Sequence, residues 1–439
     1  MRTLMISSGV LLTVLMLASI LIPWWKQRRH LLSYWSFFII GSMVFISMSL
    51  AQNAAVLSSG HEFGSEALVF IAATFIFYGL ASLVYFKPMR GRAPSRPVQW
   101  WPTDTGHSLV VAAIIFGTIG PLVPLIPPFP GAQLFYVTNA AMSILAFTLL
   151  LIYLVRNPGS LFAYLILAVV FAAGLVNVLT FGGGRRELLA LMAAIPVTAY
   201  WMYFRHRPPG RTLVGIVAVA SIGILVVTSY TSVRHADRDM AGGTARAVER
   251  IKQLPSAMAD QLTSLRFFGG QGAVFDGQNA VWAGMLTIAL TETDGTLQRD
   301  YFATPKFVLL NPIPRSLWPS KPEGLGKILP VAMGEHVVNW GPSIIGHAFY
   351  DGGWPMIIIY GLGLGLIMRH LDRAMLMDPD NPWLIALQCS IIGHVIGFSR
   401  GDCGVLGINI LGTMVVLAAM ILMLRPALGA RPHHGSLPA

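Results

Sequence analysis

Long apolar runs recur along the whole chain, with short clusters of charged residues between them. A helix of about 20 apolar residues crosses a hydrocarbon core of about 30 Å. A strand or an open loop cannot satisfy its backbone polar groups in lipid, so each run is expected to be helical. The runs predict eleven membrane-spanning helices, at residues 3–23, 31–51, 67–86, 107–127, 134–155, 160–180, 187–204, 211–230, 343–368, 383–398 and 404–424.

The composition fits a membrane protein and excludes an ordinary soluble enzyme. Of the 439 residues, 55% are hydrophobic and 11% are charged, whereas a soluble domain carries about 25% charged residues. We therefore predict an all-α polytopic membrane protein with one long external loop between its eighth and ninth helices. Its parts are residues 1–230 with the first eight helices, 231–342 with the long loop, and 343–439 with the last three helices and the tail.

The distribution of cations predicts an orientation. Alternate short loops and the tail together hold fifteen lysines and arginines, whereas the short loops of the other parity hold Arg185, Arg186 and Arg400. By the positive-inside rule the cation-rich loops are cytoplasmic, so the amino terminus and the long loop face outward and the carboxyl terminus faces inward. The net charge of +11 then serves orientation and binding to anionic lipids, and no nucleic-acid partner is expected.

The long external loop contains two segments with helical character. Residues 231–272 are polar and predict a helix that lies at the membrane surface. Residues 280–290, AVWAGMLTIAL, are apolar but too short to span. They predict an interfacial or re-entrant helix packed on the membrane domain.

The first motif is FGGGRRE, residues 181–187, which puts Arg185 and Arg186 at an external helix start. Glycines let a backbone approach a ligand closely, and a helix amino terminus favours anions. Arginine adds forked donors that suit phosphate. The motif predicts a diphosphate-binding site. The alternative is that the two arginines reach lipid headgroups or pair with Glu187.

The second motif is PIPRSLWPSKP, residues 312–322, a stiff extended loop rich in proline. It carries Arg315 and Lys321, and Trp318 offers a flat face for stacking on a sugar ring. These residues predict a substrate-guiding loop. The alternative is an ordinary surface loop with two solvated cations.

The third motif is SIIGHAFYDGGWP, residues 343–355, at the outer start of a span. His347 and Asp351 are four residues apart and share a face if this segment is helical. Ionisable groups at this depth are costly and usually functional, and a histidine exchanges protons near neutral pH. The motif predicts a catalytic acid–base pair. The alternatives are a histidine bonded to a neighbouring helix and a hydrated helix end. Three upstream residues compete as the base: Glu323, Glu335 and His336.

The fourth motif is FSRGD, residues 398–402, in another external turn. Arg400 is a candidate third arginine for the same anionic ligand. An ion pair between Arg400 and Asp402 that closes the turn is the alternative. The two cysteines, Cys389 and Cys403, form no metal-ligand pattern.

Four of these stretches, GGGRR, IPRSLWPSKP, SIIGHAFYDGGWP and SRGD, resemble the Wzy-type oligosaccharide repeat unit polymerases, which make bacterial O-antigens and exopolysaccharides. The span count and the late outward loop are also similar to that family. His347 stands where many relatives are expected to have an acidic residue, which resembles the histidine arrangement of the related O-antigen ligases.

The resemblance implies a metal-independent, inverting glycosyltransferase of the C superfamily in the bacterial inner membrane. It would polymerise undecaprenyl diphosphate-linked repeat units at the periplasmic face, without a cofactor. The implied site residues are His347, Asp351 and Glu335 for catalysis, Arg185, Arg186 and Arg400 for the diphosphate, and Arg315, Lys321, Trp318 and Tyr350 for guiding the substrate. Membrane lipids, a flippase and a chain-length regulator are the expected partners.

Two other functions stay open at this point. An O-antigen ligase would use the same chemistry and transfer the glycan to lipid A-core. A transporter or flippase for lipid-linked oligosaccharides is a different class. Acidic residues are scarce in the predicted spans, and no pair of interrupted helices marks a midplane site, which disfavours a transporter.

Overall fold

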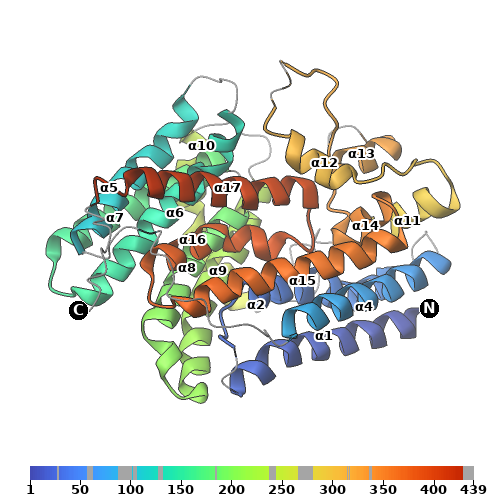
Figure 1. The fold of residues 1–439 in the computed structure, drawn as a ribbon, viewed down its shortest axis with the longest axis horizontal. Helices are drawn as coiled ribbons and strands as arrows, with labels where there is room; N and C mark the ends of the chain where they lie inside the picture. The colour runs from blue at the N-terminus through green and yellow to red at the C-terminus, as the bar shows by residue number, and fades with distance from the viewer. Residues whose placement is uncertain are drawn as a thin grey trace, which may run out of the picture.

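The computed structural model describes residues 1–26, 29–56, 63–87, 101, 106–126, 132–182, 185–236, 244–264, 280–313, 315, 317–335 and 339–428. Within these ranges the chain is helical and has no β-strand. The helices, shown in Figure 1, are α1 (Arg2–Trp25), α2 (Tyr34–Ser42), α3 (Met48–Val56), α4 (Ser65–Phe86), α5 (Gly106–Leu122), α6 (Ala132–Arg156), α7 (Leu161–Asn177), α8 (Arg185–Met202), α9 (Pro209–Ala236), α10 (Thr244–Ser264), α11 (Ala280–Ile288), α12 (Ala303–Leu310), α13 (Leu325–Ala332), α14 (Ser343–Tyr350), α15 (Trp354–Met377), α16 (Pro382–Gly397) and α17 (Cys403–Leu424).

The protein is an all-α polytopic membrane protein, as the apolar runs predict. In the described part of the chain, 9 helices are long and apolar enough to cross a membrane. Two of the expected spans fall outside that set and are covered by α9, with 28 residues, and by the shorter apolar helix α16. A helix therefore covers most of each predicted span, while the count of eleven crossings stays a prediction.

The expected single helix over 343–368 is wrong, because the chain breaks between α14 and α15. Gly352 has φ 149° and Gly353 has φ 70°, a region of backbone space that glycine tolerates and other residues avoid. Pro355 follows in the first turn of α15, where it has no backbone N–H to lose. The candidate span starts at Trp354. The eight residues of α14 form a separate short helix.

Both segments of the long loop contain a helix, as expected, while their place at the membrane surface stays a prediction. The polar stretch contains α10, and the side chain of Arg250 on this helix donates to Leu179 O and to the Tyr230 hydroxyl. The short apolar stretch forms α11, whose side chains are mostly buried against α3, α4 and α14. Residues 265–279, which join the two, lie outside the described residues.

Close helix packing in the bundle depends on glycine at particular positions. Helix α15 lies beside α4, and Figure 1 shows both running alongside α1. A β-carbon at Gly361 of α15 would lie 2.8 Å from Phe77 O, and one at Gly365 would overlap Ala81 O. Small residues let the backbones of two membrane helices approach in this way.

Two buried polar side chains, Gln388 and Asp372, pair helices of the bundle. Gln388 of α16 accepts a hydrogen bond from the Trp201 indole N–H at 2.8 Å. Asp372 of α15 accepts from Tyr34 N at 2.7 Å and from the Tyr85 hydroxyl at 2.7 Å, so it satisfies the amino terminus of α2. Since unpaired polar groups are costly in an apolar interior, these bonds fix how α2, α8, α15 and α16 meet.

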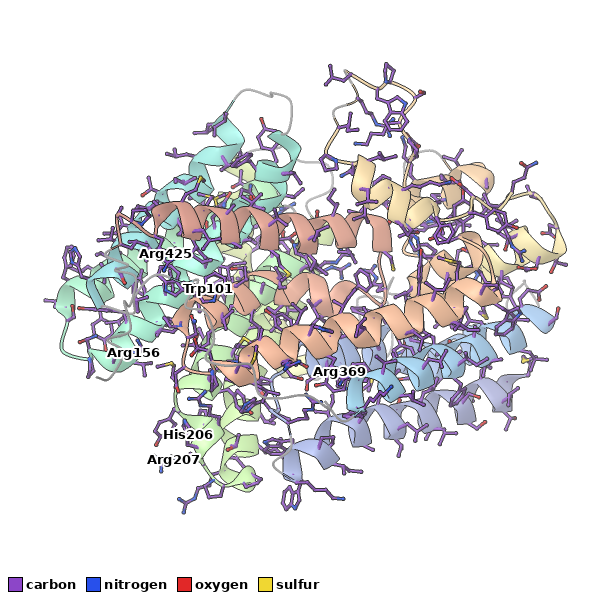
Figure 2. All side chains as sticks on the ribbon, viewed as in Figure 1. Trp101, Arg156, His206, Arg207, Arg369 and Arg425 are labelled. Atoms are coloured by element: carbon purple, nitrogen blue, oxygen red, sulfur yellow. The ribbon has the colours of Figure 1, made fainter. Side chains whose placement is uncertain are left out.

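The short helices gather at one end of the bundle. Figure 1 shows α11, α12, α13 and α14 near the amino-terminal ends of α15 and α17. Figure 2 shows Arg156, Arg207 and Arg425, three cations of the predicted cytoplasmic set, well away from these helices. That separation fits the alternation of charge along the chain.

The glycine contacts between α15 and α4 predict a matched pair of variants. Gly365→Leu is expected to lower the free energy of unfolding by about 1–3 kcal/mol or more, because the new side chain has no room against Ala81. Gly363→Leu on the same helix is the control, since nothing lies within 4 Å of its added β-carbon. Thermal unfolding of the purified protein in detergent measures both. Equal midpoints for the two variants would contradict the packing described here.

Candidate functional site

The turn between α16 and α17, residues 398–402, joins two of the short helices at this end of the bundle to the last span. Arg400 O accepts from Ser343 N at 3.4 Å, which attaches the start of α14. The Asp402 carboxylate accepts from Gly404 N at 2.9 Å and so caps α17. It also accepts from Gly326 N at 2.8 Å, which attaches α13. We call residues 398–402 the α16–α17 turn.

His347 lies beside this turn and is 1% exposed. Its Nε2 accepts the backbone N–H of Cys403 at 3.0 Å. An amide can only donate, so the ring proton is on Nδ1, which donates to the Thr304 hydroxyl at 2.8 Å. Asp402 Oδ1 lies 3.6 Å from Nε2. Both ring nitrogens are thus engaged, and the ring ties α12, α14 and α17 together.

Asp351 is fully buried at the end of α14. Its carboxylate accepts from Thr304 N at 3.2 Å and makes a short hydrogen bond with the Tyr360 hydroxyl. Burial raises the pKa of Asp351, while the nearby His347 and the hydrogen bonds from Tyr360 and Thr304 act in the opposite direction. The prediction that His347 and Asp351 share a face is confirmed, since both contact Thr304.

Two unusual backbone conformations flank these contacts. Among the described residues, Phe302 with φ 61° and Ser343 with φ 63° are the non-glycine residues with positive φ. Phe302 N donates to Asp351 O at 3.1 Å, and Ser343 N donates to Arg400 O. Each such conformation costs about 1–3 kcal/mol and is concentrated at functional sites.

Arg186 brings the glycine–arginine motif to the same turn. A β-carbon at Gly397 would lie 2.7 Å from Arg186 Nε, and one at Gly401 would lie 2.9 Å from its Nη2. A β-carbon at Gly393 would overlap the Arg186 carbonyl. Three glycines spaced four residues apart therefore leave a groove in which Arg186 lies.

The other two predicted anion-binding arginines are Arg185, at the start of α8, and Arg400, in the α16–α17 turn. Arg185 is the first residue of α8 and is half-buried. Arg400 is half-buried, and its guanidinium carbon lies 5.7 Å from the centre of the Phe45 ring. The structure thus brings the arginines of two motifs, which are more than two hundred residues apart in the sequence, to one end of α8 and α16.

The proline-rich loop places its two cations in different environments. Lys321 is buried, and its Nζ donates to Asn311 O and to Ile313 O. Burial, followed by the nearby Arg315, lowers the pKa of Lys321. Arg315 is exposed, donates to Lys321 O at 3.1 Å and lies 3.5 Å from Glu323. Lys321 therefore braces the loop, and Arg315 is the cation that the loop presents.

The remaining predicted site residues are more scattered. Tyr350 is buried in α14, and burial raises its pKa. Trp318 is half-buried and its indole N–H donates to the Ser320 hydroxyl at 3.0 Å. Glu335 is exposed after α13 and is not among the contacts of the α16–α17 turn. His336 lies outside the described residues.

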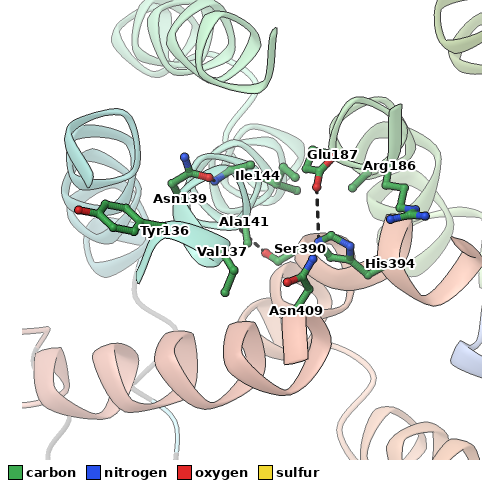
Figure 3. A pocket seen from close by; sticks show the side chains of 12 residues that line it. Tyr136, Val137, Asn139, Ala141, Ile144, Arg186, Glu187, Ser390, His394 and Asn409 are labelled. Atoms are coloured by element: carbon green, nitrogen blue, oxygen red, sulfur yellow. Dashed lines mark hydrogen bonds and ion pairs between the residues drawn. The ribbon is translucent and has the colours of Figure 1, made fainter. Parts of the chain in front are cut away.

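A polar pocket of about 210 Å³ lies between α6, α8, α16 and α17, next to the Arg186 groove. Figure 3 shows Glu187 facing His394 across it, with Glu187 Oε1 3.8 Å from His394 Nε2. The Ser390 hydroxyl donates to Ala141 O at 3.1 Å in its wall. The other polar lining residues are Tyr136, Asn139, Arg186 and Asn409.

The pocket was not predicted from the sequence, although a signal was present. Asn139, Ser390, His394 and Asn409 all interrupt predicted apolar spans. Polar residues inside membrane helices face a protein interior or a cavity and mark functional positions. Thr304, which holds both His347 and Asp351, carried no such signal because it lies in the first turn of α12, a short helix of the long loop.

No protein-family model, curated protein or solved structure matches this chain. In the part of the chain that the structure describes, no group of three or more His, Cys, Asp or Glu side chains is arranged to hold a metal ion. The function is therefore inferred from the geometry of the α16–α17 turn, the Arg186 groove and the pocket.

The hydrogen bond between His347 and Thr304 predicts a measurable loss of stability. Thr304→Val keeps the shape of the side chain and the backbone N–H to Asp351 but leaves the buried Nδ1–H of His347 unpaired. The expected cost is about 1–3 kcal/mol in the free energy of unfolding. Thr291→Val is the control, because the Thr291 hydroxyl bonds only carbonyls of its own helical segment. If both variants unfold together with the parent protein, the buried hydrogen bond between His347 and Thr304 is absent.

Proposed function

We propose that this protein is a membrane glycosyltransferase that polymerises undecaprenyl diphosphate-linked oligosaccharide units at the periplasmic face of a bacterial inner membrane. The observation that carries the proposal is the approach of the Arg186 guanidinium to Gly401 in the α16–α17 turn, which also contains Arg400. Two arginines at the ends of membrane helices suit the diphosphate of a lipid carrier.

The arginines would act where charge develops in the reaction. The bond between the sugar C1 and the diphosphate oxygen breaks, and a hydroxyl of the acceptor unit forms the new bond to C1 with inversion. The lipid diphosphate leaves as an anion. Arg186 and Arg400, with Arg185 beside them at the start of α8, would stabilise that charge without a change in their own positions.

The acceptor hydroxyl must give up its proton, and His347 is the base in this proposal. Nε2 of His347 would accept the proton, and Asp402, 3.6 Å away, would stabilise the resulting imidazolium. The N–H of Cys403 occupies this nitrogen in the structure, so the hydrogen bond would have to open when substrate binds. Apo structures commonly show catalytic hydrogen bonds that rearrange in the complex. Asp351 would hold Thr304 and so position His347.

The proline-rich loop would guide the glycan. Arg315 is exposed on this loop, and Trp318 stands beside it. Lys321 supports the loop from within through its bonds to Asn311 O and Ile313 O. The lipid tails would remain in the membrane beside the helices.

The decisive variant is Arg186→Ala in cells that make the polymer. Removal of one preorganised charge partner is expected to lower the rate of polymerisation by about 100-fold or more. Long-chain glycan should disappear from a gel of the lipid-linked saccharides, and single repeat units should accumulate. Arg211→Ala, at an exposed arginine in the first turn of α9, should leave the ladder unchanged.

The same gel separates the related functions. Accumulation of full-length lipid-linked polymer, rather than single units, would indicate a ligase. Normal long-chain polymer in the Arg186→Ala variant would contradict the diphosphate site. Glycosyl transfer by the purified protein in detergent separates an enzyme from a transporter.

A further inference from the structure

The pocket between α6, α8, α16 and α17 is a second feature of this end of the bundle, and the transfer chemistry above does not use it. It has a volume of about 210 Å³. An apolar cavity of about 150 Å³ holds one benzene ring, and pockets for drug-sized ligands begin at about 300 Å³. The pocket therefore has room for one six-membered ring with hydroxyl groups and not for an oligosaccharide.

His394 makes the pocket a binding site and not only a packing gap. The side chain is 5% exposed and lines the pocket. In the described part of the chain its Nδ1 has no hydrogen-bond partner. Its Nε2 is 3.8 Å from Glu187, which is longer than a hydrogen bond. A buried ring nitrogen without a partner is costly in a membrane protein. Because Nδ1 is enclosed by protein, a polar ligand in the pocket would bond to it once the ring turns toward the pocket.

The other lining groups offer donors and acceptors in several directions. Asn139 accepts its neighbour's N–H through Oδ1, which leaves its amide hydrogens as donors. The Ser390 hydroxyl proton is shared between Ala386 O and Ala141 O, and its lone pairs remain as acceptors. Glu187 and Asn409 add a carboxylate and an amide. Hydroxyl groups both donate and accept, so a sugar ring can bond to every one of these groups.

The position of the pocket relates it to the diphosphate site. Asn409 is six residues into α17 and Ser390 is seven residues from the end of α16, so the pocket reaches about 10 Å below those helix ends. Arg186 lies at its rim, with its guanidinium at Gly397 and Gly401. In the view of Figure 3, His394 lies between Asn139 and this guanidinium. A diphosphate at Arg186 would hold its attached sugar beside the pocket.

We infer that this pocket binds a single sugar residue, the one joined directly to the lipid diphosphate, and that His394 and Asn409 contribute to recognising its hydroxyl groups. The inference rests on the proposed function for the identity of the lipid carrier. The pocket would then select the first sugar of the donor unit, while the rest of the glycan lies outside it.

Binding to the purified full-length protein in lipid nanodiscs tests the inference. The probes are undecaprenyl diphosphate and the same lipid carrying glucose, galactose or N-acetylglucosamine. The parent protein is expected to bind at least one sugar-bearing lipid about tenfold more tightly than undecaprenyl diphosphate, as one or two added hydrogen bonds would give. His394→Ala and Asn409→Leu should lose that gain and bind undecaprenyl diphosphate as the parent does. His370→Ala, at an exposed histidine of α15, should keep it.

Two pocket variants are measured so that the result does not depend on one that fails to fold. Binding of undecaprenyl diphosphate shows whether each variant is folded. The absence of a sugar-dependent gain in the parent protein, as expected if a phospholipid headgroup fills the pocket, would overturn the inference. A gain that persists in both pocket variants would overturn it too. Arg186→Ala should weaken all four lipids. If it does not, the proposed diphosphate site is wrong. The difference in affinity between lipids with and without a sugar still tests whether the pocket binds the sugar.

Discussion

The carboxylate of Asp402 is the interaction on which the candidate site depends. It satisfies an amide at the start of α17, the amide of Gly326 at the start of α13, and it lies close to Nε2 of His347. Helix amino termini leave amides without intrahelical partners, and such groups are costly away from water. One buried carboxylate therefore joins α13 to the last span, α17, and lies beside α14.

Much of the fold could be predicted because a chain that crosses lipid can adopt very few backbone structures. Hydropathy located the long apolar helices, and charge alternation put Arg186 and Arg400 at the same end. The break after Asp351 was missed, although Gly352, Gly353 and Pro355 are a turn signal, because the apolar residues on either side form one continuous run. Hydropathy registers the apolar content of a segment and not the direction of its backbone.

Burial of individual polar side chains was harder to predict, since it depends on packing between distant segments. Lys321 looks like a solvated loop cation, yet its Nζ bonds two carbonyls of its own loop. His347 looks like a proton acceptor, yet both of its nitrogens bond the protein. The Arg186 groove requires glycines at 393, 397 and 401, and their spacing has meaning only once α8 is known to lie against α16.

The polar groups at this end of the bundle divide into two kinds. Asp402, Asp351 and Lys321 are bonded on several sides, so they form a rigid frame whose geometry does not depend on a ligand. His394 lines a cavity, and its Nδ1 has no hydrogen-bond partner among the described residues. Binding sites combine a preorganised frame with a cavity whose polar groups are not all hydrogen-bonded. The frame is already ordered, so ligand binding costs little conformational entropy. A ligand in the cavity supplies the missing hydrogen bonds. Arg186 touches both, in a groove that glycine leaves open, and so joins the rigid turn to the pocket.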